Sequence, residues 1–190
     1  MQVIIIQDFK TDESNRHLEK YIGEISRGAD IDDRKYNVTI ALYDNIPFED
    51  IRTYSTLGMN RYFIEYYYEF IFVCMAKYNE NEIASFLTSF AEYLIDGEKG
   101  ICRGDVLSFD FTMTSETKIN SLYFTLPFYF NDELQELQLE DKGIVFPLII
   151  PVYQDEAELI KEKGWNAFED FLEENEIDNL WDLNREAYVW

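Results

Sequence analysis

The stretch GIVFPLIIPVYQDEAELIKEKGWNAFEDFL, residues 143–172, decides the fold of this 190-residue chain. Its first part is apolar on both alternating sides, which predicts a strand that is buried on both faces and central in a sheet. Proline lacks the amide donor of a strand ladder, so we expect Pro147 and Pro151 at the ends of this strand or beside a bulge. From about Gln154 the spacing becomes that of a helix with one apolar and one acidic side.

This predicted helix turns a set of small and apolar residues inward: Ala157, Ile160, Gly164, Ala167, Phe168, Phe171 and Leu172. A glycine inside a helix costs about 1 kcal/mol relative to alanine, so Gly164 indicates the close approach of another backbone. The other side carries eight acids that we take as a candidate partner-binding surface: Glu156, Glu158, Glu162, Glu169, Asp170, Glu173, Glu174 and Glu176. The alternative is that these acids form only the solvated side of the helix.

The rest of the chain predicts a single α+β domain over residues 1–190. Strand patterns occur at 3–6, 36–42, 51–57, 62–75, 101–110 and 121–130, followed by a polar, acidic loop at 134–143. One helix is predicted from Thr11 or Asp12 to Gly28. A second runs from Asn79 to Gly97, where Asn79 and Glu82 resemble a capping box.

The predicted strand at 62–75 follows a turn near Gly58–Asn60 and has two different faces. One face is aromatic and apolar and consists of Ile64, Tyr66, Tyr68, Phe70 and Phe72. The other contains Glu65, Tyr67 and Glu69. We therefore expect a sheet that is covered on the first face and wetter on the second.

The charge balance is strongly acidic, with 38 Asp and Glu against 16 Lys and Arg and a formal net charge of -22. A field of this sign repels nucleic acid and anionic lipid and speeds encounter with a basic protein, although acidity also serves solubility alone. The longest apolar run, residues 70–76, is too short to span a bilayer. The start of the chain lacks a basic n-region and a small-residue cleavage site. We expect a cytoplasmic protein that binds neither nucleic acid nor membrane.

No catalytic, cofactor-binding or metal-binding motif is readable. His17 is the only histidine, so a serine or cysteine nucleophile has no second histidine to serve as its base. Cys74 and Cys102 lack zinc-site spacing and are expected to be two reduced thiols. Glycine-rich phosphate loops are absent. The remaining enzyme hypothesis is a pair of convergent carboxylates, which would show as a cleft with acids of raised pKa.

Three segments resemble suppressor-of-fused domain proteins. The first has Thr56, Leu57, Gly58 and Met59 before a strand with Glu65 or Glu69 in an acidic position; the second has Ile150, Pro151, Glu156 and Gly164; the third has Asp182, Asn184 and Arg185. The likeness runs from about residue 36 to the end. This chain departs from the pattern in the Asn60-Arg61-Tyr62 that follows the methionine.

The resemblance implies a central mixed, largely antiparallel sheet flanked by helices. It also implies a protein that acts by binding, as bacterial members of the family resemble immunity proteins or antitoxins. Our hypothesis is that the chain neutralises a cognate toxin, basic in charge, such as a nuclease or another polymorphic or LXG-type toxin domain. The alternative is a regulatory module that binds an endogenous protein. We expect the motif residues Thr56, Gly58, Met59, Pro151, Gly164, Asp182, Asn184 and Arg185 to be structural, with Arg185 paired to an acid. The sequence indicates no oligomeric state.

Overall fold

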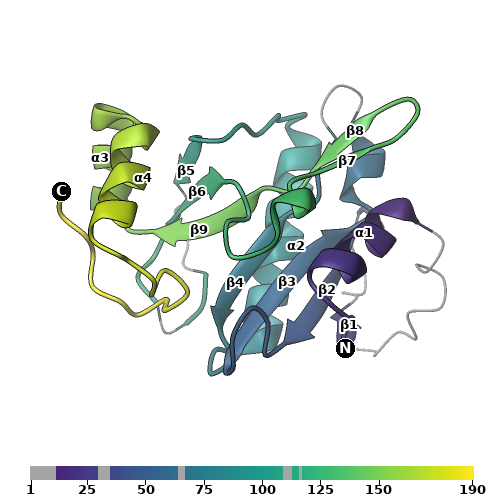
Figure 1. The fold of residues 1–190 in the computed structure, drawn as a ribbon, viewed down its shortest axis with the longest axis horizontal. Helices are drawn as coiled ribbons and strands as arrows, with labels where there is room; N and C mark the ends of the chain where they lie inside the picture. The colour runs from purple at the N-terminus through teal and green to yellow at the C-terminus, as the bar shows by residue number, and fades with distance from the viewer. Residues whose placement is uncertain (1–11, 30–34, 64–66, 109–112, 116) are drawn as a thin grey trace.

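The computed structural model describes residues 12–29, 35–63, 67–108, 113–115 and 117–190, and seven of its strands form one sheet (Figure 1). Their order across the sheet is β1 (Arg27–Ala29), β2 (Thr39–Asp44), β3 (Ile51–Leu57), β4 (Ile71–Met75), β9 (Leu148–Val152), β6 (Ser121–Thr125) and β5 (Val106–Ser108). Neighbours pair antiparallel except for the parallel pair β4–β9. The prediction of a mixed, largely antiparallel sheet in an α+β fold is confirmed.

Strand β9 lies inside the sheet, as its apolar sequence predicts. It pairs with β6 along its length and with β4 at Leu148 and Ile149 only. All five of its residues are buried. Pro147 precedes the strand, and Pro151 is its penultimate residue, beyond the last pair with β4. Both prolines therefore lie where a missing amide donor is tolerated.

Helices cover both faces of the sheet and build two cores. On one face α2 (Glu80–Asp96) packs its aromatic stripe on the sheet, with the ring of Phe90 5.5 Å from Phe70 and 5.9 Å from Phe124. The second core contains residues of α1 (Glu13–Tyr21), α3 (Gln154–Lys163) and α4 (Trp165–Glu174). Phe168 of α4 meets Tyr123 of β6 edge to face at 5.1 Å. Figure 1 shows α3 and α4 beside each other at the β5–β6 end of the sheet.

The predicted first helix is correct at its start and wrong at its end. The Asp12 side chain accepts a hydrogen bond from the Ser14 N–H at 3.0 Å and caps α1. The helix ends at Tyr21 instead of Gly28, because Gly23 adopts a φ of +135° that a right-handed helix cannot contain. The residues near Gly28 form the edge strand β1. The strand predicted at 3–6 lies outside the described residues.

Two further segments differ from their predictions. The long strand expected at 62–75 is limited to β4, and a 3-10 turn, Met59–Tyr62, precedes it; residues 64–66 lie outside the described ranges. The expected acidic loop at 134–143 contains the 3-10 turn Asp132–Leu134 and a hairpin of β7 (Glu136–Gln138) and β8 (Gly143–Val145). Hairpin formation places the apolar Leu137 opposite Ile144, which is buried.

The acidic helix is two helices, and the reason proposed for Gly164 is wrong. Gly164 ends α3 and precedes α4 with a φ of +91° and a ψ of 152°. A Cβ added there would meet nothing within 4 Å, so no other backbone approaches closely. The glycine is needed for a backbone conformation that is essentially restricted to glycine. None of the helices in the described ranges has the length and hydropathy to cross a bilayer.

Candidate partner-binding surface

Six of the eight candidate acids are exposed on α3, on α4 or just after α4. We call this set the α3–α4 acidic face; it consists of Glu158, Glu162, Asp170, Glu173, Glu174 and Glu176. The burial of Ala157, Ile160, Phe168 and Leu172 holds both helices on the sheet. The six carboxylates therefore stand on a rigid support. The other two candidates, Glu156 and Glu169, are engaged inside the protein.

Glu156 is fully buried and forms an ion pair with Arg185, whose side chain is 1% exposed. The pair is bidentate, with Arg185 Nη1 donating to Oε1 at 2.5 Å and Nη2 donating to Oε2 at 2.8 Å. Glu156 also accepts from the N–H of Tyr153 and of Tyr188, both at 2.7 Å. The expectation that Glu156 contacts a partner is corrected, because its carboxylate holds the chain end to the start of α3. Arg185 is paired internally, as expected.

Arg185 also braces the strand that leads into α3. Its Nη2 donates to the carbonyl oxygen of Pro151 at 3.1 Å. The guanidinium lies over the ring of Tyr188 at 4.4 Å. The motif residues Pro151 and Arg185 are 34 positions apart in the sequence and are hydrogen-bonded in the folded protein. Arg185 binds Glu156 at the same buried place. This contact links the end of β9, the start of α3 and the chain end.

Glu169 joins α4 to the sheet and to the turn before β5. It accepts hydrogen bonds from Tyr123 and Thr125 of β6, each at 2.6 Å, and forms an ion pair with Arg103. Burial acts to raise the pKa of Glu169, but the donors Arg103, Thr125 and Tyr123 outweigh it and lower the pKa. Glu169 is therefore an internal carboxylate that lines a cleft, and it is not part of the α3–α4 acidic face.

This cleft, which we call the α4 cleft, has a volume of about 470 Å³ and lies between α4, β6 and the segments 126–135 and 176–180. Its lining combines apolar side chains, including Ile150, Leu172 and Leu180, with the acids Asp132, Glu169, Glu173 and Glu176. Phe128, 50% exposed, also lines it. The α4 cleft is the hollow into which two members of the acidic face, Glu173 and Glu176, project.

A second buried carboxylate organises the turn at 58–60. Glu69 is 0% exposed and accepts from the backbone N–H of Gly58 at 2.9 Å, of Met59 at 3.2 Å and of Asn60 at 3.1 Å. The Asn60 side-chain amide donates as well, at 2.6 Å. The prediction of a wetter face at Glu69 is wrong, because these donors replace water around the carboxylate. Burial raises the pKa of Glu69, and the donors of the turn oppose this rise.

The remaining motif residues of this turn are structural in their contacts. Gly58 has a φ of +90°, and a Cβ there would lie 3.2 Å from the carbonyl oxygen of Asn37. Thr56 Oγ1 accepts from the Phe70 N–H at 2.8 Å, and Met59 is fully buried. Of the two acids that could hold the motif's acidic position, Glu69 contacts this turn, and Glu65 lies outside the described residues. These residues join the end of β3 to the start of β4.

Asp182 ties the chain end to the turn between β4 and α2. Its Oδ1 accepts from the Asn184 N–H at 3.1 Å, from Lys77 Nζ at 3.2 Å and from the Tyr78 hydroxyl. Burial acts to raise the pKa of Asp182, but the donors, Tyr78 first among them, outweigh it and lower the pKa. Asn184 contributes its backbone and is exposed. The third motif therefore positions Arg185 for its contact with Glu156.

A sequence model of the family described as "Suppressor of fused protein (SUFU)" matches residues 34–186. The chain belongs to this family. It is 25% identical over 164 residues to "Immunity protein YqcF" of Bacillus subtilis (strain 168), an alignment that covers 83% of this chain and 85% of that protein. The resemblance seen in the three sequence motifs is confirmed.

Solved structures of SUFU proteins share the fold. A SUFU homologue from Neisseria gonorrhoeae FA 1090 matches with a TM-score of 0.76 at 16% identity, covering 97% of this chain and 98% of that one. A Sufu–Fu complex matches with a TM-score of 0.61 at 15% identity, covering 78% of this chain and 75% of that one. Drosophila Suppressor of Fused gives 0.59 at 16% identity, and the match covers 78% of this chain and 42% of that one.

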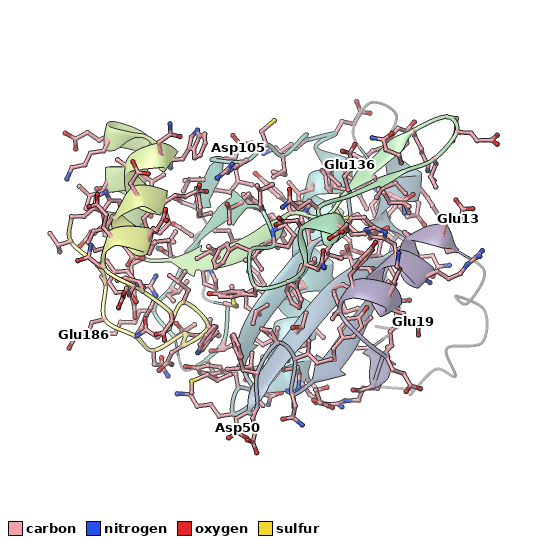
Figure 2. The ribbon with its side chains drawn as sticks, in the orientation of Figure 1. Glu13, Glu19, Asp50, Asp105, Glu136 and Glu186 are labelled. Atoms are coloured by element: carbon pink, nitrogen blue, oxygen red, sulfur yellow. The ribbon has the colours of Figure 1, made fainter. Side chains whose placement is uncertain are left out.

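The surplus negative charge of this SUFU protein is spread around the molecule. Figure 2 labels acids on several different sides of it: Glu13, Glu19, Asp50, Asp105, Glu136 and Glu186. Several of the 16 basic side chains are held in ion pairs, including Lys35, Arg61, Lys77, Arg103 and Arg185. Charge alone therefore does not distinguish the α3–α4 acidic face from the rest of the surface. What distinguishes it is the neighbouring α4 cleft.

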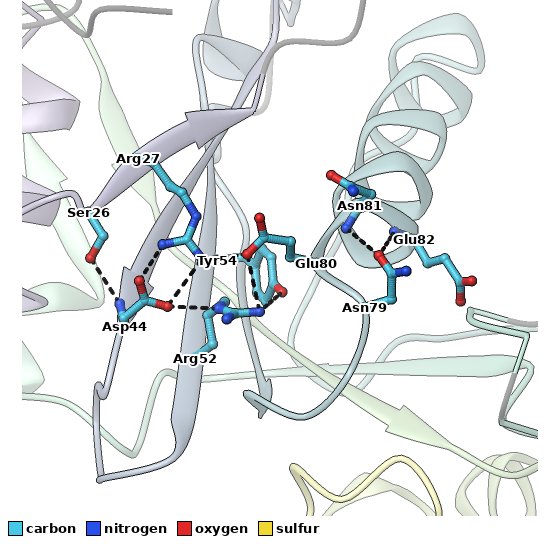
Figure 3. Close-up of polar contacts among 9 residues, drawn as sticks. All are labelled: Ser26, Arg27, Asp44, Arg52, Tyr54, Asn79, Glu80, Asn81 and Glu82. Carbon is cyan, nitrogen blue, oxygen red and sulfur yellow. Dashed lines mark hydrogen bonds and ion pairs between the residues drawn. The ribbon is translucent and has the colours of Figure 1, made fainter. Parts of the chain in front are cut away.

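At the β1–β3 end of the sheet, two arginines are held in ion pairs with acids of the protein itself (Figure 3). Asp44 of β2 accepts from Arg27 and from Arg52 Nε, the latter at 2.9 Å, and Glu80 pairs with Arg27. Asn79 accepts from the N–H of Asn81 at 2.9 Å and caps α2. The Glu82 N–H also donates to Asn79 Oδ1, at 3.4 Å, and the Glu82 side chain accepts from the Ser115 N–H at 2.9 Å. The network ties α2 to the β1–β3 edge.

In the described part of the chain, the histidine, the two cysteines and the carboxyl group with a raised pKa all have structural surroundings. No group of three or more His, Cys, Asp and Glu able to hold a metal occurs among the described residues. His17 Nε2 lies 3.4 Å from the Leu134 carbonyl oxygen, its ring stacks on Phe146, and burial lowers its pKa. Cys74 is buried, Cys102 is exposed, and both are free thiols. The raised pKa of Glu69 belongs to a core carboxyl that does not line the α4 cleft.

Proposed function

We propose that this SUFU protein is an immunity protein that binds and neutralises a cognate toxin without catalysis. The observation that carries the proposal is the α3–α4 acidic face, six exposed carboxylates of which Glu173 and Glu176 line the α4 cleft, on a chain of net charge -22. The name of its Bacillus subtilis relative, "Immunity protein", supports the same role. The binding is proposed to occur in the cytoplasm, and residues 1–190 are taken as one binding domain.

The charge identifies the chemistry of the proposed partner. A basic surface is attracted to this protein at long range, and a nuclease needs such a surface to hold phosphate. An acidic protein bound to that basic surface would compete with the nucleic acid for it. Without the toxin, the acidic protein and the nucleic acid would repel each other. A basic nuclease is therefore the toxin class that this surface suits best.

The direct test is protection of a growing cell. Basic proteins retained on the tagged protein from its own host would be identified and expressed from an inducible promoter, with and without this chain. Rescue of growth by the chain, together with a stable complex in size-exclusion chromatography, is the expected result. A toxic partner that still arrests growth while bound, or partners with only neutral or acidic surfaces, would contradict the proposal.

Charge neutralisation on α4 tests whether the face is the interface. We expect Asp170→Asn, Glu173→Gln and Glu174→Gln, combined, to slow association and to flatten its salt dependence. The matched control removes three charges elsewhere on the surface: Glu13→Gln, Glu24→Gln and Glu186→Gln. Stopped-flow association rates across ionic strengths would compare the two. Equal slowing in both triple variants would show that net charge acts without a defined acidic interface.

A second role has one specific observation in its favour. The Sufu–Fu complex contains a relative of this fold bound to another protein, which supports a regulatory module that holds an endogenous partner. Under that role, the captured protein would be harmless on expression and changed in activity on binding. The growth assay separates the two roles, because only a toxin arrests cells in the absence of this chain.

A further inference from the structure

The acidic surface alone does not say where a partner docks. Carboxylates lie on many sides of the protein (Figure 2), and long-range steering depends mainly on their sum. Binding energy, in contrast, concentrates at apolar and aromatic anchors that become fully desolvated at the centre of an interface. The docking centre should therefore be the place where accessible apolar surface and carboxylates occur together.

The α4 cleft meets both conditions. Ile150, Leu172 and Leu180 are nearly completely buried residues of the second core whose side chains line the cleft. Phe128, half exposed, stands beside them. An apolar side chain entering the cleft would thus be removed from water against side chains already fixed by the core. Little rearrangement of this protein is needed for such binding.

The charges lining the cleft select a basic occupant. Four carboxylates, Asp132, Glu169, Glu173 and Glu176, line it with one cation, Arg103. Arg103 is engaged by Glu169 and stacks over the Trp165 ring at 4.6 Å, so its charge is already matched. The other three carboxylates belong to exposed residues. A lysine or arginine next to the inserted apolar side chain would lie against them.

An aromatic row continues from the cleft, with partly buried rings in its middle and exposed rings at its two ends. The Phe128 ring lies 4.3 Å from Tyr129, Tyr129 lies 5.2 Å from Trp181, and Trp181 lies 5.3 Å from Phe48. Phe48, in the turn between β2 and β3, is 51% exposed. Tyrosine and tryptophan are enriched at binding hot spots. The row extends the apolar contact from the α4 cleft to the β2–β3 turn, where the exposed Asp50 adds negative charge.

We propose that the α4 cleft is the anchor point of this protein, and that it takes a partner segment in which an apolar side chain is flanked by lysine or arginine. The aromatic row supports the rest of that segment. This inference rests on the proposed function, since it names the part of the acidic surface that holds the basic partner. It also separates two groups of acids: those of the cleft hold the partner, and those of α3 only attract it.

A peptide can test the cleft independently of any toxin. The probe is a fluorescein-labelled peptide with Leu-Phe at its centre and two lysines on each side. Two comparison peptides carry glutamate in place of lysine, or Ser-Gly in place of Leu-Phe. We expect only the first to bind, with its affinity measured by fluorescence anisotropy at low and physiological salt. Equal binding of the Ser-Gly peptide, or no binding of the first peptide at about 1 mM, would overturn the inference.

Matched variants of the protein locate the site. Glu173→Gln with Glu176→Gln removes two charges at the cleft, and Glu158→Gln with Glu162→Gln removes two from exposed positions on α3. We expect the cleft pair to weaken binding by about tenfold and the α3 pair by less than about threefold. Phe128→Ala should also weaken binding by about tenfold. The control for the lost aromatic ring is Tyr93→Ala, which removes a 46% exposed ring from α2.

The outcomes distinguish this inference from the proposed function. Equal losses in the two charge pairs, or full binding by Phe128→Ala with native circular dichroism, would overturn the cleft as the anchor. A wild-type protein that protects cells from a toxin would keep its proposed role in either case. Conversely, specific peptide binding by a protein that rescues no toxin-expressing cell would retain the cleft and contradict the immunity function.

Discussion

Glu156 and Glu162 are the same residue type on the same helix, and burial gives them different roles. Glu162 is exposed, whereas Glu156 is fully buried with four hydrogen bonds from Arg185, Tyr153 and Tyr188. Glu156 is the third residue of α3. Its carboxylate accepts a hydrogen bond from the backbone N–H of Tyr153, the residue that precedes the helix. At the residue scale, position within a helix therefore decides whether an acid serves the fold or the surface.

We expect Glu156→Gln to destabilise the protein by about 3–5 kcal/mol, because it leaves the Arg185 guanidinium buried without its counter-charge. Glu162→Gln is the matched control, and its effect should stay within about 0.5 kcal/mol. Urea unfolding followed by circular dichroism would measure both. Similar unfolding midpoints for the two variants would contradict the assignment of Glu156 to the core.

At the scale of elements, one glycine divides the acidic segment into two helices. Gly164 combines a φ of +91° with a ψ of 152° and has free space around its missing Cβ. Its role is therefore conformational, and it sets the relative directions of α3 and α4. The exposed acids of the two helices, and the position of α4 beside the cleft, depend on this break.

Gly164→Ala should destabilise the protein by about 1–3 kcal/mol through backbone strain alone, because the added methyl group meets no neighbour. Gly164→Asn should be destabilising to a similar degree, since asparagine tolerates the left-handed helical region but not this one. Thermal unfolding of both variants would measure the effect. A wild-type melting temperature for Gly164→Asn would rule out the proposed strain.

The sequence predicts elements well where pattern and local signals agree. Helix α2 lies between its predicted cap Asn79 and the predicted stop Gly97, and β9 lies inside the sheet as its apolar run indicates. Prediction fails where a tertiary contact decides. The pattern around Glu69 indicates an exposed position, but donors from a turn about ten residues earlier allow its burial. The alternation of polar and apolar residues along a strand carries no information about such a contact.

The candidate site was predictable in part. Six of the eight acids are exposed, as the helical pattern indicates, but the cleft beside them was missed. Its lining comes from segments around residues 103, 123–135, 150 and 169–180, which only the folded sheet brings together. Phe128 follows a proline in a run that reads as a strand, and no local signal marks it as a surface residue.

At the scale of the whole molecule, several carboxylates are stabilised by the fold in their charged form. Asp12, Asp44, Glu169 and Asp182 all have lowered pKa values, because donors outweigh the opposing effect of burial. Their contribution to stability is complete above the unfolded-state pKa of about 4 and is lost as the pH falls through the lower folded-state values. Acid therefore weakens contacts at several places in the fold at once.

We expect the free energy of unfolding to decrease as the pH falls below about 4, with protons taken up on unfolding. Asp182→Asn removes one of the responsible groups, so its unfolding free energy should depend less steeply on pH in this range. Urea titrations from pH 7 down to pH 2 would measure the slopes for both proteins. An unchanged slope in the variant, with its Tyr78 contact intact, would contradict the role given to Asp182.

The turn at residues 58–60 has a consequence for the ligands that this protein can accept. Three successive backbone N–H groups point at one spot, an arrangement that forms a nest for phosphate or carboxylate in other proteins. Here the nest is filled from within, because the Glu69 carboxyl group accepts all three hydrogen bonds. These three N–H groups are therefore not available to a phosphate or carboxylate from another molecule.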